Sequence, residues 1–159
     1  MTQIGLIHTD FICANQSNQC HRCAKKTETM NYLHQDLTEQ VIKAFYKVYN
    51  TLGFGFLERV YQNALFIELK KQGLPCETQK QIKVFYEGYE VGEYFPDIIV
   101  NGVLILELKA VEILVEPHKL QLINYLKSTE IEIGLLLNFG KNPEIKRKIF
   151  TNDRKKLAH

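Results

Sequence analysis

The chain has 159 residues, of which 45% are hydrophobic and 24% are charged, and this balance is typical of one globular domain with its own core. The formal net charge of +2 does not by itself imply a nucleic-acid partner. No apolar run is long enough to span a membrane. The runs Ile4–Ile7 and Phe11–Cys13 are also too short for the core of a signal peptide, so the expected location is the cytoplasm.

The first part of the chain differs from the rest. Residues 1–29 are polar and show no sustained period, whereas the pattern becomes regular from Met30 onward. We therefore expect an irregular or disordered extension over residues 1–29 and a single domain over residues 30–159, with Met30 as a candidate natural start. Cys20 and Cys23 have the spacing of half a zinc site, but no second pair completes it, and a zinc site is not the favoured interpretation.

Two helices are expected first. Apolar residues recur at helical spacing after Asp36, which resembles an N-terminal cap, and they predict a helix over residues 37–51. These apolar positions are Leu37, Val41, Ala44, Phe45, Val48 and Leu52. A second helix is predicted from about Phe56 to Gln72, with Gly73 as its C-terminal stop.

The period then changes to that of strands. Two hairpins are predicted, each from two alternating segments joined by a turn dipeptide. They are Gln81–Tyr86 with Tyr89–Tyr94 across Glu87-Gly88, and Phe95–Val100 with Val103–Lys109 across Asn101-Gly102. Both faces of the segment Val103–Lys109 are apolar, so we expect this strand at the centre of the sheet.

The last part of the chain predicts a helix from Pro117 to about Lys127, a strand over Ile131–Asn138, and a final helix from Asn142-Pro143 to about Phe150. The predicted fold class is α/β, with a mixed central sheet flanked by helices. A late basic cluster comprises Lys146, Arg147, Lys148, Arg154, Lys155 and Lys156. A solvated terminal helix and tail is the favoured interpretation of this cluster, and a phosphate-facing edge is the alternative.

Glu107 and Lys109 place two charges on one face of the predicted central strand, at its end. Buried charges are costly unless they are paired or bound to metal, although a strand that simply reaches solvent would explain them as well. Asp97 lies across the predicted hairpin. A two-residue Asn101-Gly102 turn would set Asp97 opposite Leu106, whereas a three-residue loop or a bulge would set it opposite Glu107. Only the second arrangement brings the three charged groups together.

Two carboxylates and an ammonium group suit the hydrolysis of phosphodiesters. Carboxylate oxygens are hard ligands that can hold Mg²⁺ or Mn²⁺. Such an ion activates water and stabilises the charge that grows on a phosphate. A nearby lysine can orient or deprotonate the attacking water and can add positive charge.

Two helical stripes carry further polar residues. The stripe of the second predicted helix consists of Glu58, Tyr61, Leu65 and Glu68. We expect Glu68 to be a solvated side chain beside core residues, and Gly55 to let the backbone turn sharply into this helix. The stripe of the later helix consists of His118, Gln121 and Tyr125. It either covers a core edge or points at the carboxylates.

Together these signals resemble the GxxExxY proteins, which are grouped with the PD-(D/E)xK nuclease superfamily. The naming motif stands here as Gly55, Glu58 and Tyr61. The superfamily signature stands as Pro96-Asp97 followed by Glu107-Leu108-Lys109, and the Gln-xxx-Tyr element of the RecB-like branch stands as Gln121 and Tyr125. The resemblance covers about residues 30–150. One such motif is a weak signal, but three motifs in the right order are fairly specific.

The resemblance implies a restriction-endonuclease-like αβββαβ core. It implies a metal-dependent nuclease that hydrolyses phosphodiester bonds of nucleic acid, with DNA as the expected substrate. It further implies that Mg²⁺ (or Mn²⁺) is bound by Asp97, Glu107 and Glu58, and that Lys109 handles the water. The residues that would contact the substrate or support the site are Gln121, Tyr125, His118 and Tyr61.

Two questions stay open at the level of sequence. Many nucleases of this kind pair up to cut two strands, so a homodimer is compatible with the sequence but is not demanded by it. The alternative function is a non-catalytic nucleic-acid or protein-binding module that has kept the nuclease fold. The near-neutral charge and the small size favour that alternative.

Overall fold

The computed structural model describes residues 34–155. The extension predicted over residues 1–29, with its half zinc site and the candidate start at Met30, lies outside the described residues. From Gln40 onward the chain forms one compact unit, which holds the sheet and all the candidate site residues. No helix among the described residues is both long enough and apolar enough to cross a bilayer.

Both predicted N-terminal helices are present. Helix α2 spans Gln35–Leu52 and helix α3 spans Glu58–Lys71. The prediction that Asp36 caps α2 is wrong, because Asp36 lies within the first turn, which the hydrogen bond from Thr38 N to the His34 carbonyl closes. Helix α3 begins two residues later than predicted. Its end agrees with the prediction, since Gly73 follows it with φ of +76°.

Five strands form the main sheet, in the order β1-β4-β5-β6-β7. They are β1 (Cys76–Thr78), β4 (Ile98–Val100), β5 (Leu104–Lys109), β6 (Ile133–Asn138) and β7 (Glu144–Ile149). Strands β5 and β6 are parallel and are connected through helix α4 (Glu116–Lys127), whereas the other neighbouring pairs are antiparallel. The mixed central sheet flanked by helices is therefore confirmed, with β1 as an added strand too short to show an alternating pattern.

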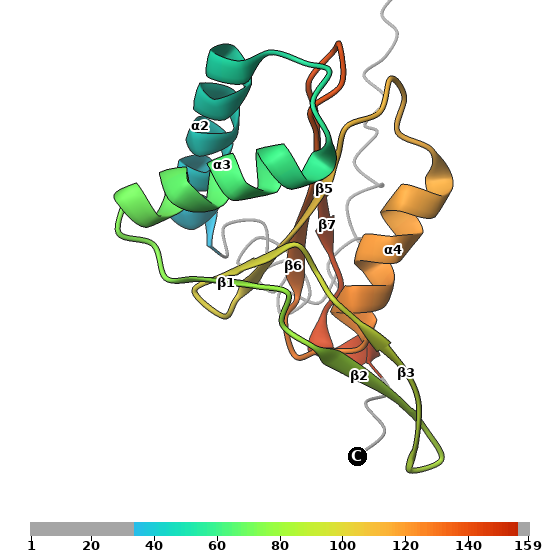
Figure 1. Cartoon of the computed structure of the whole chain (residues 1–159). Coiled ribbons are helices and arrows are strands. Elements are labelled where there is room, and N and C mark those ends of the chain that lie inside the picture. The colour runs from blue at the N-terminus through green and yellow to red at the C-terminus, as the bar shows by residue number, and fades with distance from the viewer. Residues whose placement is uncertain (1–33, 156–159) are drawn as a thin grey trace, which may run out of the picture. The chain divides into compact units, whose positions relative to one another are not determined.

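Strand β5 lies at the centre of this sheet and is buried on both faces, as predicted. The side chain of Ile105 belongs to a cluster with Leu122 and Leu126 of α4, so the odd-numbered residues of β5 face α4. The even-numbered residues face the opposite side, where α3 contacts the strand. Figure 1 shows α3 and α4 on opposite sides of the sheet. Every residue from Leu104 to Leu108 is at most 2% exposed.

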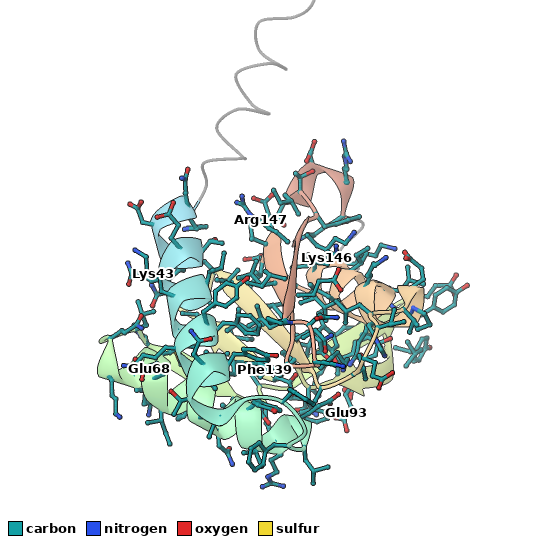
Figure 2. All side chains as sticks on the ribbon, turned by 90° about the horizontal axis from the view of Figure 1, so that it is seen from above. Lys43, Glu68, Glu93, Phe139, Lys146 and Arg147 are labelled. Atoms are coloured by element: carbon teal, nitrogen blue, oxygen red, sulfur yellow. The ribbon has the colours of Figure 1, made fainter. Side chains whose placement is uncertain are left out.

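Phe139 joins the helices to the sheet. It follows β6 directly, and its ring centroid lies 4.6 Å from that of Phe45 in α2 and 4.3 Å from that of Tyr61 in α3. Figure 2 shows Phe139 in the interior of the molecule. These aromatic contacts bury large apolar surfaces and hold the start of α3 near the end of β6.

The final helix predicted from Asn142-Pro143 to Phe150 is wrong, because this segment forms strand β7. Its two isoleucines, Ile145 and Ile149, are four residues apart, a spacing that fits one face of a helix as well as one face of a strand, and the segment is only six residues long. Pairing with β6 also satisfies backbone groups that β6 would otherwise leave open at the edge of the sheet. Lys146 and Arg147, labelled in Figure 2, therefore belong to an edge strand and not to a solvated terminal helix.

The central position of β5 generates a stability prediction. Leu106 is fully buried between Ile98 of β4 and Leu135 of β6. Leu106→Asp places an unpaired carboxylate there, and we expect it to lower the free energy of unfolding by more than about 4 kcal/mol. Urea unfolding followed by circular dichroism measures this change, with Leu106→Met as the volume-matched control. A Leu106→Asp protein with the unfolding midpoint of the parent would contradict the central placement of this strand.

Candidate active site at the end of strand β5

The loop between β4 and β5 decides which carboxylates meet. Val100 pairs with Leu104, which leaves a three-residue loop, and two of the loop residues, Asn101 and Gly102, have positive φ values of 51° and 68°. The observed register pairs Ile98 with Leu106, and continuing it by one residue sets Asp97 opposite Glu107. The loop length that allows the charged groups to converge is therefore the one observed.

Two groups hold Asp97 in place. Its Oδ2 accepts a hydrogen bond of 2.7 Å from the backbone N–H of Leu108. Its backbone carbonyl accepts one of 2.8 Å from Nε2 of Gln62 on α3. Sequence analysis did not select Gln62, although it lies one helical turn after Glu58 and therefore on the same side of the helix. Helix α3 thus fixes the backbone at Asp97.

Glu107 is a carboxylate buried in the sheet. The residue is 2% exposed, and its Oε1 accepts a 2.6 Å hydrogen bond from Nζ of Lys109. Its other oxygen, Oε2, is buried and has no hydrogen-bond partner in the described part of the chain. Burial raises the pKa of Glu107 to about 7, and the nearby charge of Asp97 adds to this rise. A buried carboxylate oxygen without a partner is costly and is available to a cation.

The charge of Lys109 depends on the same pair. Burial lowers the pKa of Lys109, but the hydrogen bond and charge of Glu107 outweigh burial, and the net pKa is raised. Lys109 is therefore held as an ammonium group next to Glu107. Burial also raises the pKa of Asp97, against the hydrogen bond from Leu108 and the charge of Lys109.

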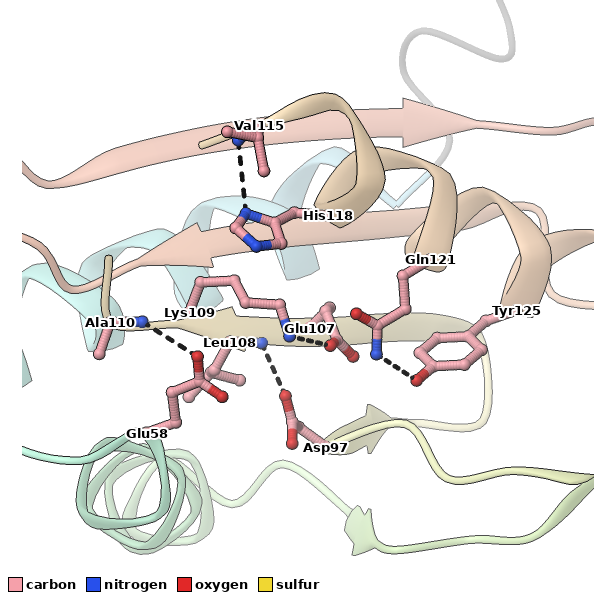
Figure 3. A network of polar contacts seen from close by, with 10 residues as sticks. All are labelled: Glu58, Asp97, Glu107, Leu108, Lys109, Ala110, Val115, His118, Gln121 and Tyr125. Carbon is pink, nitrogen blue, oxygen red and sulfur yellow. Dashed lines mark hydrogen bonds and ion pairs between the residues drawn. The ribbon is translucent and has the colours of Figure 1, made fainter. Parts of the chain in front are cut away.

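Glu58 reaches the site from the first turn of α3. Its Oε1 accepts a long hydrogen bond of 3.4 Å from the backbone N–H of Ala110, the residue after β5. Figure 3 shows Glu58 and Asp97 on one side of β5, with the Lys109 side chain on the other. The charge of Glu58 contributes to the raised pKa values of Asp97 and Glu107. The structure therefore places Glu58 near Asp97 and Glu107.

Helix α4 supplies two further polar groups beside Glu107 (Figure 3). Nε2 of Gln121 donates a 2.7 Å hydrogen bond to the hydroxyl of Tyr125. Burial raises the pKa of Tyr125 to about 12, so its hydroxyl stays neutral. His118 lies nearer the start of the helix, where its Nδ1 accepts a 3.4 Å hydrogen bond from the backbone N–H of Val115. Gln121 and Tyr125 therefore lie beside the carboxylate of Glu107. The hydrogen bond of His118 instead satisfies a backbone N–H at the start of α4.

Two of the residues singled out on α3 lie apart from the carboxylates. Tyr61 is fully buried. Its hydroxyl donates to the Gly53 carbonyl and accepts from the backbone N–H of Phe56, so it holds the turn before α3. Gly55 has φ of +104° in that turn, as its predicted role requires. The prediction of a solvated Glu68 is wrong, because Glu68 is 8% exposed and forms an ion pair of 2.5 Å with Lys47 of α2.

The segment after β5 is held by a residue that sequence analysis missed. Asn138, fully buried at the end of β6, accepts a 3.0 Å hydrogen bond from Val111 N and donates one of 2.8 Å to Val111 O. A Cβ on the neighbouring Gly140 would lie 2.0 Å from the same Val111 carbonyl. The sequence signal that could have identified Asn138 is its position as a polar residue at the end of an otherwise apolar strand. Together Asn138 and Gly140 position the backbone that follows Lys109.

The donor set fits a divalent cation in its chemistry. Asp97, which precedes β4, and Glu58 of α3 lie close enough to Glu107 for their charges to raise its pKa, and Oε2 of Glu107 lacks a partner among residues 34–155. Within that part of the chain no group of three or more His, Cys, Asp and Glu side chains is placed so that it could hold a metal ion. Instead Asp97, Glu107 and Glu58 accept hydrogen bonds from Leu108, Lys109 and Ala110. A cation would therefore replace some of these hydrogen bonds.

Comparisons with known proteins identify a family for this chain. A family model described as the PD-(D/E)XK nuclease superfamily matches residues 35–148. A solved structure titled "Crystal structure of SSO0001" has 19% sequence identity and a TM-score of 0.49, and the match covers 74% of this chain and 59% of that chain. The present chain thus matches less than two thirds of that protein's length. No curated protein matches the chain.

The raised pKa of Glu107 predicts an unusual dependence of stability on pH. Because folding raises this pKa from 4.5 to about 7, the folded protein binds the proton more tightly than the unfolded chain does. The cost of ionising Glu107 is absent below pH 4.5, grows as the pH rises towards 7, and is complete above pH 7. The full effect is about 3 kcal/mol. We expect Glu107→Gln to gain about this much stability relative to the parent between pH 4.5 and pH 8.

Urea unfolding of both proteins in EDTA, at pH 4.5, 6, 7 and 8, measures this difference. Glu112→Gln is the control, because Glu112 is exposed and close in sequence to the site, and this variant should not gain stability with pH. If the free energies of unfolding of Glu107→Gln and the parent differ by the same amount at all four pH values, Glu107 does not carry the proposed burial cost.

Asn138 generates a prediction about local order. Asn138→Ala removes both hydrogen bonds to Val111 and leaves a buried peptide group without its partners, so we expect a loss of about 2 kcal/mol in the free energy of unfolding. Amide hydrogen exchange at Val111 should accelerate by more than the loss in the global free energy of unfolding explains. Asn142→Ala, at an exposed position in the following turn, is the control and should change neither quantity. Unchanged exchange at Val111 would show that Asn138 does not hold this segment.

Proposed function

Because the chain belongs to the PD-(D/E)XK nuclease superfamily, we propose that it is a metal-dependent nuclease that hydrolyses phosphodiester bonds of DNA. The observation that carries this proposal is the convergence of Asp97, Glu107 and Lys109 at the end of the central strand. The same motifs support a finer assignment to the GxxExxY proteins and to the RecB-like branch. That assignment depends on the motif residues Gly55, Glu58, Tyr61, Gln121 and Tyr125.

Asp97, Glu107 and Glu58 would hold the ion. Superfamily members generally use divalent metals, and oxygen ligands of this kind favour Mg²⁺ or Mn²⁺. When bound, such an ion lowers the pKa of water and neutralises charge on the phosphate. The buried Oε2 of Glu107, which lacks a hydrogen-bond partner among the described residues, supports this ligand set. The burial that raises the pKa of Glu107 also supports it, because a cation relieves the same cost.

Lys109 acts in this proposal as a charged donor. Its ammonium group is held by Glu107 at 2.6 Å, and its net pKa is raised, so it carries a proton at neutral pH. An ammonium group in this place orients the attacking water and stabilises the negative charge that develops on the phosphate. Of the two roles that sequence analysis left open for Lys109, this geometry favours orientation over removal of a proton.

The polar residues of α4 would support the site or contact the DNA. Gln121 and Tyr125 form a hydrogen-bonded pair next to Glu107, and each can still offer a hydrogen bond to a phosphate or to water. In this proposal His118 and Tyr61 have structural roles and do not contact the substrate. His118 accepts a hydrogen bond at the start of α4, and Tyr61 holds the turn from which Glu58 enters the site.

The test is cleavage of linear and of circular DNA by the purified protein, with Mg²⁺ or Mn²⁺ against EDTA. We expect cutting that requires the metal, and a loss of about 100-fold or more in Glu107→Gln. Lys109→Met should lose cutting to a similar degree but keep its affinity for Mn²⁺, measured by calorimetry. The contrast between linear and circular substrates separates exonuclease from endonuclease activity.

The matched control is Lys119→Met on α4, because Lys119 pairs with Glu116 in a partly exposed position and should be dispensable for cutting. A Lys109→Met protein that cuts at the parental rate would remove Lys109 from the mechanism. If the parent neither cuts nor binds Mn²⁺, the nuclease proposal fails and the non-catalytic binding module takes its place.

A further inference from the structure

Strands β2 (Ile82–Tyr86) and β3 (Tyr89–Tyr94) form a two-stranded ribbon apart from the main sheet. All six residues of β3 are exposed. Several aromatic rings of the ribbon face solvent, among them Tyr86, Tyr89 and Tyr94, which are 66%, 76% and 37% exposed. Figure 1 shows the ribbon extending away from the sheet near the lower end of α4. Exposed aromatic rings in one place mark a binding surface more often than a random solvent face.

The pairing of the two strands sorts their side chains onto two faces. The pairs Tyr86 with Tyr89, Val84 with Gly92, and Ile82 with Tyr94 lie on one face, which we call the tyrosine face. The pairs Lys83 with Glu93 and Phe85 with Glu90 lie on the other, which we call the charged face. The irregularity between Val84 and Phe85 lies in β3, so it leaves the alternation of β2 intact.

The charged groups of the strands are paired on their own face. Nζ of Lys83 lies 2.7 Å from Oε2 of Glu90, and Gln81 donates a hydrogen bond to Glu93. The tyrosine face therefore has no ionised side chain from either strand. Phosphate groups bind to cationic side chains, so this face is suited to an uncharged part of a ligand.

The tyrosine face is continuous with the candidate active site. The ring of Tyr94 makes an edge-to-face contact with Tyr125 at 5.4 Å between centroids, and Tyr125 is hydrogen-bonded to Gln121 beside Glu107. Farther along the face, a Cβ on Gly92 would meet no atom within 4 Å, so the space between Tyr94 and the outer tyrosines is open. A nucleic-acid strand that leaves the active site along the ribbon would pass these rings in succession.

We propose that the tyrosine face of the β2–β3 ribbon binds unpaired bases of the nucleic acid that the candidate active site cuts. This inference rests on the proposed function. Aromatic rings stack on the faces of bases regardless of sequence, which supplies binding without cations. Bases within a duplex present their edges and not their faces, so the surface selects a single-stranded segment. The sugar, DNA or RNA, is left to the experiment.

The test is fluorescence anisotropy of labelled 12-nucleotide DNA and RNA strands, and of the matching DNA duplex, with the full chain in EDTA so that no strand is cut. We expect tighter binding of single strands than of the duplex. The double variant Tyr86→Ala/Tyr89→Ala should weaken single-strand binding on the order of tenfold for each ring removed. Tyr86→Phe/Tyr89→Phe should retain the parental affinity, because the rings remain.

Phe85→Ala is the matched control. Phe85 is a neighbouring aromatic residue, 43% exposed, that lies on the charged face, and its loss should leave single-strand affinity unchanged. An equal loss in Phe85→Ala, or unchanged binding in the double alanine variant, would overturn the proposal. So would a tyrosine-dependent dimer in sedimentation, with no tyrosine-dependent binding of a strand, since the face would then hold a second copy of the chain.

Cleavage assays on the same variants separate the two proposals. If the parent cuts DNA and the double alanine variant cuts single-stranded substrate equally well, the ribbon inference fails and the nuclease survives. If no variant cuts but single strands still bind through the tyrosines, the proposed nuclease fails and the ribbon remains a surface for unpaired bases.

Discussion

A carboxylate in a strand that is buried on both faces has to be compensated, and Glu107 is in that position. Its neighbours along β5 are fully buried, so the sheet cannot offer it water. The structure compensates one oxygen with the ammonium group of Lys109 and leaves the other without a partner among residues 34–155. The raised pKa of Glu107, the charge of Lys109 and the suitability of the site for a cation all follow from this burial.

The supporting elements act by fixing backbone around that buried charge. Helix α3 holds the carbonyl of Asp97 through Gln62, and Asn138 at the end of β6 holds the segment after Lys109 through Val111. Phe139 ties the same end of the sheet to both α2 and α3. The proposed metal ligands therefore lie on elements that are packed against one another, which is the condition for a site with defined geometry.

The candidate active site and the tyrosine face of the ribbon have different chemistry. Within the site Glu107 is buried and paired with Lys109, whereas the outer tyrosines of the ribbon, Tyr86 and Tyr89, are exposed and the tyrosine face carries no ionised strand residue. Chemistry on a phosphate needs charge, but holding a strand of variable sequence needs contacts that do not depend on which base is present. The contact between Tyr94 and Tyr125 is where these two kinds of surface meet.

The sequence by itself determined the types of most elements and the residues of the carboxylate set. The helix over residues 37–51 has a strong periodic pattern because it buries a regular apolar face, the helix over residues 117–127 is marked by Pro117 in its first turn, and the central strand is apolar on both faces. Motif spacing was sufficient to select Asp97, Glu107 and Lys109, which the structure then places together. The positive φ expected at Gly55 was also predictable, since a sharp turn into a helix favours glycine.

Only the tertiary structure decided what depends on partners distant in the sequence. Asn101-Gly102 is compatible with a two-residue or a three-residue loop, and strand pairing selected the longer one. The segment Glu144–Ile149 became a strand because the edge of β6 lies beside it, a neighbour that no local pattern reveals. Lys47 of α2 made Glu68 a buried, paired side chain in place of a solvated one. In each case the local sequence is compatible with two arrangements, and contacts with another element select the observed one.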